Sequence, residues 1–312
     1  MVLLQQMGIL FVYMMIGYVA CKKEYFDQEF GKKLSWLVVN VANPMLAISA
    51  VVNNEEQIAK KDFYVTVLLA ICFYAFFLIL AQILPRLIGV QKSDIGVQKS
   101  DIGVYKMMTT FNNIGFMGFP VIAAAYGNGA LIYAVPFSIM FNILCYTWGI
   151  QTLCGGGEKG NWKRIINIGT ISGIISIVLF FMQIPVPKMI CSLSAGLSNL
   201  TGPLSMLVIG ISIAAMELKD LFTDVKLLKF ALIKLLAVPV AAMLLVCQVI
   251  DNRLICEVFL VMMATPAASM CAMLSQQYGG DYELAAKGVA LTTILSVVTM
   301  PIVSEIVFHI AV

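Results

Sequence analysis

Charged side chains are scarce in this sequence. Asp, Glu, Lys and Arg make up 12% of the 312 residues, and histidine occurs once. Soluble domains are about one quarter charged. The apolar share of 61% and the mean hydropathy of +0.93 therefore exclude an ordinary soluble protein and predict an integral membrane protein. The formal net charge of +3 is too small to indicate a nucleic-acid partner.

Motifs for metal binding and for hydrolysis are also missing. None of the eight cysteines forms a CxxC pair, which favours small buried thiols over a zinc site or a disulfide framework. There is no HExxH and no GxSxG sequence. The string YGGD at Tyr278–Asp281 is similar to the GxGD of intramembrane aspartyl proteases, but its spacing differs and no second intramembrane Asp is available to share a proton. We therefore expect neither an enzyme nor a bound metal or cofactor.

Apolar runs, in contrast, fill most of the chain. A crossing needs about 20 residues, so we predict ten transmembrane helices: Val2–Cys21, Leu34–Val52, Phe63–Ile88, Val104–Tyr126, Ala130–Leu153, Ile165–Ile184, Met189–Met216, Val225–Ile250, Leu254–Tyr278 and Glu283–Ile310. The first run lacks a basic start and is interpreted as a retained span rather than a signal peptide. The glycine-rich stretch Gly155–Lys163 cannot continue a helix and separates the fifth span from the sixth. The predicted fold class is an all-α membrane protein.

The distribution of basic residues predicts the orientation of these spans. One side of the membrane receives only Lys60, Lys61, Lys188 and Arg253, and the other side receives the remaining sixteen of the twenty basic residues. Cytoplasmic loops collect Lys and Arg, so the richer side is predicted to be cytoplasmic. Both termini then lie on the extracytoplasmic side of the cell (inner) membrane. Three lysines inside spans are expected to reach the cytoplasmic interface as anchors: Lys106, Lys234 and Lys287.

Two spans carry helix breakers in their middle. The fourth contains NNIGFMGFP at Asn112–Pro120, and the ninth contains Thr265 and Pro266. A proline inside a helix removes a backbone donor and clashes with the preceding turn. In hydrocarbon such a break survives only against protein or a wet cavity. Broken spans in corresponding positions of two halves are typical of a transporter binding site near the middle of the membrane.

The two halves of the sequence correspond in several places. Asn43-Pro44 interrupts the second span and Gly202-Pro203 interrupts the seventh, while AAAYGNG and SQQYGGD close the fourth and the ninth. Five spans per half is an odd number, so the second copy enters from the opposite face and the repeat is inverted. We predict a first repeat at 1–154, a cytoplasmic linker at 155–164 and a second repeat at 165–312. Between the third and fourth spans IGVQKSD occurs twice in succession, at Ile88–Asp94 and Ile95–Asp101, most simply as a duplication without function.

These motifs together resemble the auxin efflux carrier family. The likeness rests on NNIGFMGFP in the fourth span, on Thr265-Pro266 followed by LSQQYGGD in the ninth, and on NPMLAIS and GPLSMLVIGISIA in the second and seventh. It covers nearly the whole chain in the same order. The long hydrophilic central loop of the large plant exporters is missing, so the resemblance favours a compact, bacterial-type member and argues against auxin as the substrate.

The resemblance implies a fold and a site. Broken helices four and nine would cross within a transport domain of helices 3–5 and 8–10, beside a scaffold of helices 1, 2, 6 and 7. The family also implies a homodimer formed through helices two and seven, and elevator-type movement of a small organic anion. Carried over by position, the substrate-binding residues would be Asn112, Asn113, Gly115, Pro120, Thr265, Pro266 and Ser269.

The chemistry of these residues suits an anion, most simply a carboxylate. The amino-terminal end of a half-helix presents free N–H groups and about half a positive charge, and neither broken segment contains Lys or Arg. Glu257 is the candidate for proton coupling, because ionisable residues within spans are functional by default. No acidic cluster lies near either break. A sodium-coupled organic-anion symporter of the bile-acid type remains the alternative, and a channel is disfavoured by the paired halves.

Overall fold

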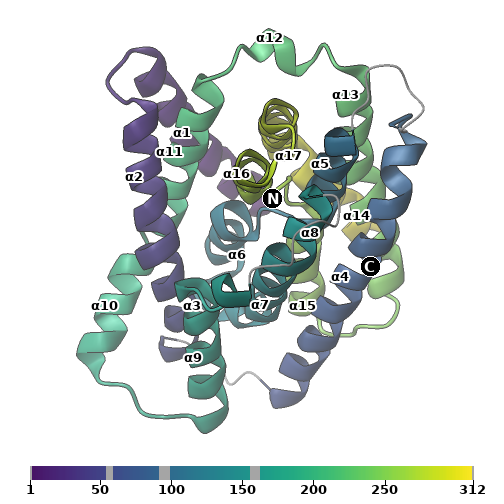
Figure 1. Ribbon diagram of the computed structural model, residues 1–312. Helices are drawn as coiled ribbons and strands as arrows, with labels where there is room; N and C mark the ends of the chain where they lie inside the picture. Colours follow the sequence, from purple (N-terminus) through teal and green to yellow (C-terminus); the bar gives the residue numbers. More distant parts are fainter. Residues whose placement is uncertain (1, 54–58, 91–98, 155–161, 311–312) are drawn as a thin grey trace.

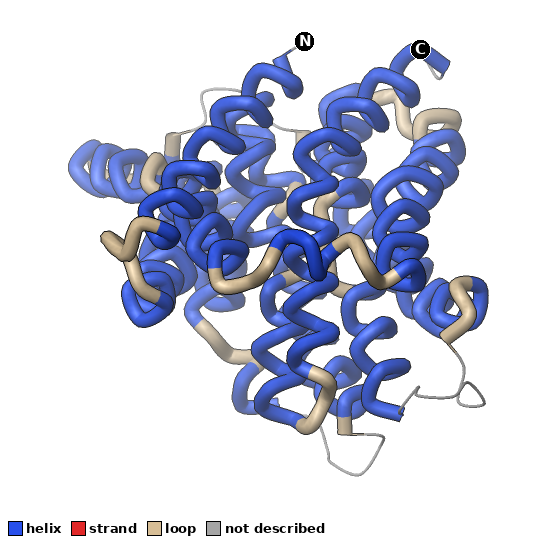
Figure 2. The backbone as a smooth tube through the Cα atoms, turned by 90° about the horizontal axis from the view of Figure 1, so that it is seen from above, coloured by secondary structure: helices blue, strands red, loops and turns tan. Residues whose placement is uncertain are grey.

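The computed structural model describes residues 2–53, 59–90, 99–154 and 162–310, and within them the chain folds into helices (Figure 2). Seven helical runs in this part are 19 to 28 residues long and apolar enough to cross a membrane: Leu4–Lys22, Gln28–Val52, Lys60–Leu87, Asn128–Leu153, Lys188–Ala214, Val225–Val246 and Tyr282–Val307. Two shorter apolar helices are Ile114–Tyr126 and Ile168–Met182. The prediction of an all-α membrane protein is confirmed.

One group of helices lies at the left of Figure 1 and is built around the pairing of α1 with α11. In this group α2 packs against α11, and α3 packs against both α9 and α10. Its members are α1 (Val2–Lys22), α2 (Gln28–Leu37), the π-helical turn η1 (Val38–Ala42), α3 (Asn43–Val52), α9 (Ile168–Met182), α10 (Lys188–Ser198) and α11 (Thr201–Ala214).

A second group fills the centre and right of Figure 1 around the long helix α17. Its members are α4 (Lys60–Leu87), α5 (Lys99–Thr110), the π-helical turn η2 (Ile114–Gly118), α6 (Phe119–Tyr126), the 3-10 helix η3 (Asn128–Tyr133), α7 (Val135–Leu144), the π-helical turn η4 (Cys145–Gly149), α8 (Ile150–Leu153), α13 (Val225–Leu232), the π-helical turn η6 (Ile233–Ala237), α14 (Val238–Val246), α15 (Arg253–Ala264), α16 (Ser269–Tyr278) and α17 (Tyr282–Ile310). The 3-10 turn η5 (Trp162–Arg164) precedes α9, and the short helix α12 (Leu218–Leu221) connects the two groups. The groups touch where α3 contacts η3, where α9 contacts α7, and where α1 and α11 contact α6.

Several helices begin at residues that the sequence marks as caps. In each, a side-chain oxygen accepts a hydrogen bond from a backbone N–H of the first turn, which supplies a partner that the helix itself cannot provide. The capping residues are Asp27 for α2, Asn167 for α9, Asp224 for α13 and Asn252 for α15.

Glycine allows α1 and α11 to approach closely. A Cβ added at Gly210 would overlap the carbonyl oxygen of Met14 and lie 2.7 Å from the amide nitrogen of Tyr18. A Cβ at Gly17 would overlap the carbonyl oxygen of Leu207. Small residues at helix contacts are the usual means of packing within lipid, where burial of apolar surface gives no driving force between helices.

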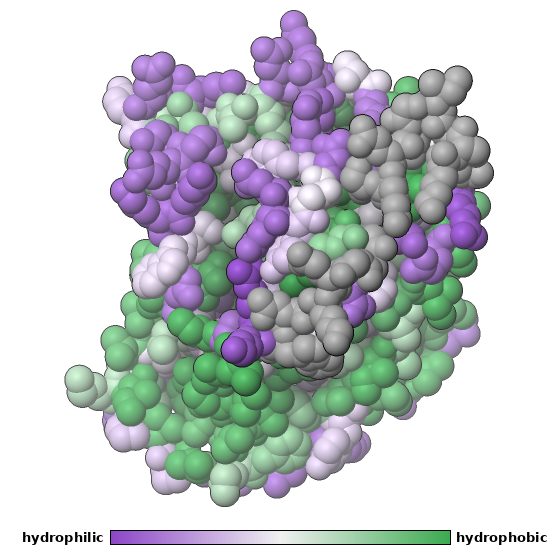
Figure 3. All heavy atoms as spheres, in the orientation of Figure 1, coloured by the Kyte–Doolittle hydropathy of each residue, from purple (hydrophilic) through white to green (hydrophobic). Residues whose placement is uncertain are grey.

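The outer surface is strongly apolar. Figure 3 shows hydrophobic residues gathered over the lower part of this face, and hydrophilic residues over the upper end, near α12 and the turn between α1 and α2. Large apolar side chains such as Leu68 on α4 and Met189 on α10 are 61% and 82% exposed. An apolar surface of this extent would be unstable in water and indicates contact with lipid. The protein is therefore a multi-pass membrane protein.

Some predicted boundaries differ from the structure. Asn43-Pro44 does not interrupt the second span, because the π-helical turn η1 passes without a gap into α3, with Pro44 in its first turn. In the seventh span the chain leaves the helix at 199–200, just before Thr201, and Pro203 lies in the first turn of α11, where its missing N–H has no cost. Most of the IGVQKSD duplication (91–98) and of the linker (155–161) lies outside the described residues.

Candidate functional site

The fourth and ninth spans are both broken, and their breaks pair with each other. The first break separates α5 from η2 at 111–113, and the second separates α15 from α16 at 265–268. Asn112 and Ala267 form an isolated antiparallel bridge. The amide of Asn113 donates to the Pro266 carbonyl at 2.8 Å, and the amide of Ala268 donates to the Phe111 carbonyl at 2.9 Å. Each unwound segment therefore supplies the backbone partners that the other has lost, as burial in hydrocarbon requires.

Pro266 explains why the ninth span breaks where it does. In a continuous helix Pro266 would leave the carbonyl of Met262 without its amide donor. That carbonyl instead accepts from the Asn112 Nδ2 group at 2.7 Å and from the Thr265 hydroxyl at 3.0 Å. From α17, the Thr292 hydroxyl accepts the amide of Ala267 at 3.2 Å. The Met262 carbonyl and the Ala267 amide therefore both have partners at the break.

Asn112 lies at the centre of the crossing and its side chain is engaged on both sides. Its Nδ2 group donates to the carbonyls of Met262 and Met263 at 2.7 and 3.3 Å, and its Oδ1 atom accepts from the ammonium of Lys234 at 2.5 Å. The residue is fully buried. It therefore joins the carboxyl-terminal end of α15 to a cation on a third segment.

The sequence analysis placed Lys234 wrongly. We predicted an anchor at the cytoplasmic interface, but the side chain is fully buried and its ammonium donates to the Thr109 carbonyl at 3.1 Å as well as to Asn112. The ring of Phe77 lies beneath it, with the nitrogen 5.0 Å from the ring centroid. Neither break, at 111–113 or at 265–268, contains Lys or Arg in its own sequence, yet the fold brings a lysine to their crossing.

Asn113 differs from its neighbour in having a free donor. Its Oδ1 atom caps the helical run of η2 and α6 by accepting the amide of Phe116 at 3.2 Å. The residue is 3% exposed, and its Nδ2 group has no hydrogen-bond partner among the described residues. A buried amide donor without a partner costs free energy, and such a group at a membrane site needs an explanation.

Gly115, two residues after Asn113, lies close to the other group of helices. A Cβ added at Gly115 would find one neighbour within 4 Å, the Nδ2 atom of Asn43 at 3.2 Å. Asn43 begins α3, in the other group of helices, and its Oδ1 atom is also buried without a partner. Pro120 is buried in the first turn of α6 and faces α11. Its Cβ atom lies 3.8 Å from the position of a Cβ added at Gly202. Ser269 is the first residue of α16, after the second break, and is half-buried.

The helix ends at the crossing have opposite polarity. The carboxyl ends of α5 and α15 present the carbonyls of Thr109, Met262 and Met263, and these meet Lys234 and Asn112. The amino ends of the η2–α6 run and of α16 begin just beyond Asn113 and Ala268. Because the peptide dipoles of each helix add, the first pair of ends attracts a cation and the second pair attracts an anion.

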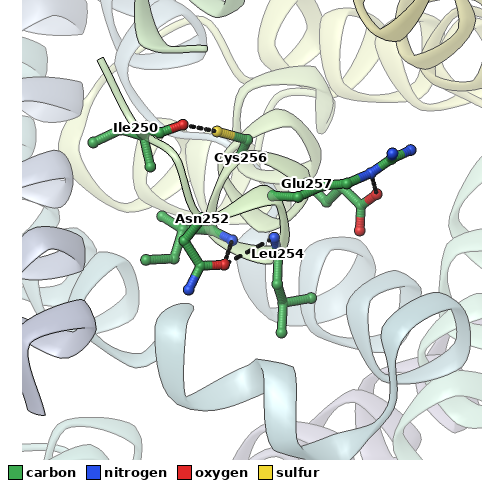
Figure 4. A network of polar contacts seen from close by, with 7 residues as sticks. Ile250, Asn252, Leu254, Cys256 and Glu257 are labelled. Atoms are coloured by element: carbon green, nitrogen blue, oxygen red, sulfur yellow. Dashed lines mark hydrogen bonds and ion pairs between the residues drawn. The ribbon is translucent and has the colours of Figure 1, made fainter. Parts of the chain in front are cut away.

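Glu257 lies near Asn252 at the amino-terminal end of α15 (Figure 4), not at the crossing. It forms an ion pair with Arg253 in the first turns of α15, with a distance of 3.0 Å between Nε and Oε1. The same end of the helix is capped by Asn252, which also donates to Asp62 of α4 at 2.8 Å. Eight residues separate Glu257 from Thr265, a rise of about 12 Å along a helix. Among the described residues there is no group of three or more His, Cys, Asp or Glu side chains that could hold a metal ion.

Comparison with known proteins gives matches along nearly the whole chain. A family model described as "Membrane transport protein" matches residues 2–164 and 157–304. An uncharacterized transporter of Methanocaldococcus jannaschii is 25% identical over 303 residues, which cover 94% of each protein. An uncharacterized transporter of Methanothermobacter thermautotrophicus is 24% identical over 197 residues, which cover 62% of this chain and 64% of the relative.

Proposed function

Because this chain belongs to the membrane transport protein family, the auxin efflux carrier family that its motifs resemble, we propose that it is a secondary carrier that moves a small organic anion across the cell (inner) membrane. The anion binds beside the crossing of the two broken spans. A compact chain of 312 residues agrees with the compact archaeal relatives.

One observation supports the proposed binding site above the others, the unpartnered Nδ2 group of Asn113. This donor is buried at the amino-terminal end of the η2–α6 run, where the helix dipole already favours negative charge. A carboxylate oxygen placed there would satisfy the donor and gain the charge-assisted strength of such a bond. In this proposal the ligand lies along Gly115, which has no side chain, and Asn43 of α3 borders it, with its Nδ2 atom 3.2 Å from the position of a Cβ at Gly115.

The ninth span would complete the pocket. The amino end of α16 begins at Ser269, whose hydroxyl is half-buried at the crossing. Two helix ends of about half a positive charge each amount to about one unit charge, which suits a single carboxylate. In this proposal Asn113, Gly115 and Ser269 contact the substrate, while Asn112, Thr265 and Pro266 hold the crossing together. Pro120 belongs to the sliding surface against α11.

The proposed mechanism is elevator-type alternating access with ten spans as two inverted repeats. The start of α1 and the end of α17 lie at the same edge of the molecule in Figure 2, which supports an even number of crossings. The distribution of basic residues favours the extracytoplasmic side for both termini. Helices α1 to α3 and α9 to α11 would form the scaffold and the group around α17 the moving domain. We further propose a homodimer through the second and seventh spans of the scaffold.

The test begins with thermal-shift screening of the purified protein against monocarboxylates, dicarboxylates and indole acids. An anion that raises the unfolding temperature is then measured with the variants Asn113→Ala and Asn113→Asp. A hydrogen bond to a charged ligand is worth roughly 1.5–3 kcal/mol, so Asn113→Ala should weaken binding about tenfold or more. Asn113→Asp keeps the oxygen that caps Phe116 but sets a negative charge against the ligand, and should abolish binding.

The matched control is Asn40→Asp. Asn40 donates to the Trp36 carbonyl from the π-helical turn η1 and is half-buried, so the variant adds the same charge away from the crossing. It should bind the anion as the wild type does. Wild-type affinity in folded Asn113→Asp protein would remove Asn113 from the site and with it the proposed anion pocket.

A further inference from the structure

We propose that the ammonium group of Lys234 is a built-in cation of the crossing, in the place that a bound monovalent metal ion would otherwise fill, so that the carrier works without sodium. The inference extends the proposed function to the question of ion coupling. It rests on the proposed function only in one respect, namely that the crossing is the site of transport.

The surroundings of the ammonium are those of a cation site. Its partners are uncharged oxygens, the Thr109 carbonyl at 3.1 Å and the Asn112 Oδ1 atom at 2.5 Å, and the face of the Phe77 ring lies 5.0 Å away. Carbonyl and amide oxygens are also the ligands that hard metal cations take in proteins. Among the described residues no carboxylate lies within ion-pairing distance of Lys234.

Helix dipoles explain why one positive charge is needed. The carboxyl ends of α5 and α15 both stop at the crossing, and each carries about half a negative charge. Asn112 connects them, since it donates to the last-turn carbonyls of α15 and accepts from Lys234, which itself bonds to the last turn of α5. One ammonium therefore balances two helix ends. A sodium ion in the same position would meet a like charge.

The chain places the lysine by a local feature of its helix. Lys234 lies in the π-helical turn η6, between α13 and α14, and this turn packs against α15 and α17. An isolated charge at this depth is costly and is retained where it has a function. Its neighbour on the same span, Lys229, is exposed, so burial of Lys234 is not a general property of the helix.

The experiment compares thermal unfolding of the purified full-length protein in sodium chloride and in choline chloride at equal ionic strength, with no organic anion present. The variant Lys234→Ser opens the oxygen-lined space, and Lys234→Met removes the charge but fills it. Lys229→Met is the matched control. We expect the wild type and the control to unfold at the same temperature in both salts. Lys234→Ser should unfold several degrees lower in choline and recover part of the loss in sodium, whereas Lys234→Met should not recover.

Three results would overturn the proposal: stabilisation of the wild type by sodium over choline, equal unfolding of Lys234→Ser in both salts, or wild-type stability of Lys234→Met. If neither variant can be purified, binding of radioactive sodium to the wild type decides. Saturable binding refutes a built-in cation, and its absence supports one. Because no anion is present, failure here leaves the anion pocket at Asn113 standing, and failure of the Asn113 variants leaves this result unaffected.

Discussion

The two adjacent asparagines at the crossing, Asn112 and Asn113, have different roles. Asn112 has its donor and acceptor engaged, with the Met262 carbonyl on one side and Lys234 on the other. Asn113 uses its oxygen to cap the following helical run and keeps a free Nδ2 group. A side chain with no free hydrogen-bonding group can hold a structure but has nothing left to offer a ligand. The division assigns stability to the first residue and binding to the second.

This division gives a prediction for Asn112. Replacement by Ala removes one of the two partners of the buried Lys234 ammonium, which keeps the Thr109 carbonyl, and one of the two donors to the Met262 carbonyl, which keeps the Thr265 hydroxyl. Losing a partner of a buried polar group costs roughly 1–3 kcal/mol, so Asn112→Ala should lower the free energy of unfolding, measured by thermal or denaturant unfolding. Asn112→Asp retains an acceptor for the ammonium and should lose less. Equal stability of Asn112→Ala and the wild type would contradict the bonding described at the crossing.

The sequence could identify the asparagines but not their partner. Two asparagines, two glycines and a proline within nine residues predict a break because each weakens a helix locally. Lys234 is separated from Asn112 by 122 positions, and its own helix reads as an ordinary apolar run with lysines toward one end. Which lysine is buried depends on a π-helical turn and on packing against other helices, and neither has a local signature.

At the scale of elements, the closest packing is between α1 and α11. Gly17 and Gly210 let the two backbones meet, so that a single methyl group at either position would overlap a carbonyl oxygen of the facing helix. Main-chain atoms cannot move aside as a flexible side chain can. The pairing therefore depends on the absence of two side chains, which hydropathy patterns do not reveal.

Gly210→Ala should separate the two helices and destabilise the protein. Overpacking costs roughly 1–3 kcal/mol even where side chains can adjust, and here the Cβ would meet the backbone at Met14 and Tyr18. The control is Gly196→Ala in α10, where a Cβ has no neighbour within 4 Å. Because Ala is the better helix former, the control should be neutral or stabilised by up to about 1 kcal/mol. Unfolding of both variants in the same detergent is the measurement, and similar losses for the two would refute the close contact.

Helix ends follow local signals in the chain, and only some of them were predicted. Thr265-Pro266 ends α15 as predicted, whereas the caps at Asp27 and Asn167 were not, so α2 begins before the predicted Leu34 and α9 begins after the predicted Ile165. The π-helical turns η1, η2, η4 and η6 were not predicted. A π-helical turn uses the same residues as an α-helix and accommodates one extra residue, so tertiary packing decides where it forms.

At the scale of the whole molecule, the important surface is the one between the two groups of helices. There Pro120 of α6 faces Gly202 of α11, and Asn43 of α3 faces Gly115 of η2. The facing residues at these two contacts include glycines and a proline, and such small residues would allow sliding there. Elsewhere between the groups, the rings of Phe180 and Phe181 of α9 contact Phe63 of α4. The sequence predicted which spans are broken, but Pro120 and Gly202 come from opposite halves of the chain, Asn43 and Gly115 come from different spans of the first half, and only the fold relates them.

A cross-link between these groups tests whether they move. The Cβ of Pro120 lies 3.8 Å from a Cβ built at Gly202, which matches the mean Cβ separation of about 3.8 Å in disulfides. In a background without the native cysteines, the pair Pro120→Cys and Gly202→Cys should oxidise readily. Pro120 lies in the first turn of α6, where proline supplies no required N–H, so its replacement should leave the fold intact.

If the group around α17 moves as an elevator, the oxidised double variant should stop exchanging the anion across proteoliposome membranes and regain exchange when dithiothreitol is added. Anion binding to the oxidised protein, measured by thermal shift, should persist, because the pocket at Asn113 lies within the moving group. The two single-cysteine variants under the same oxidant are the controls and should transport throughout. Full exchange by the cross-linked protein would show that these groups do not slide past each other, and transport would then require a movement confined to one of them.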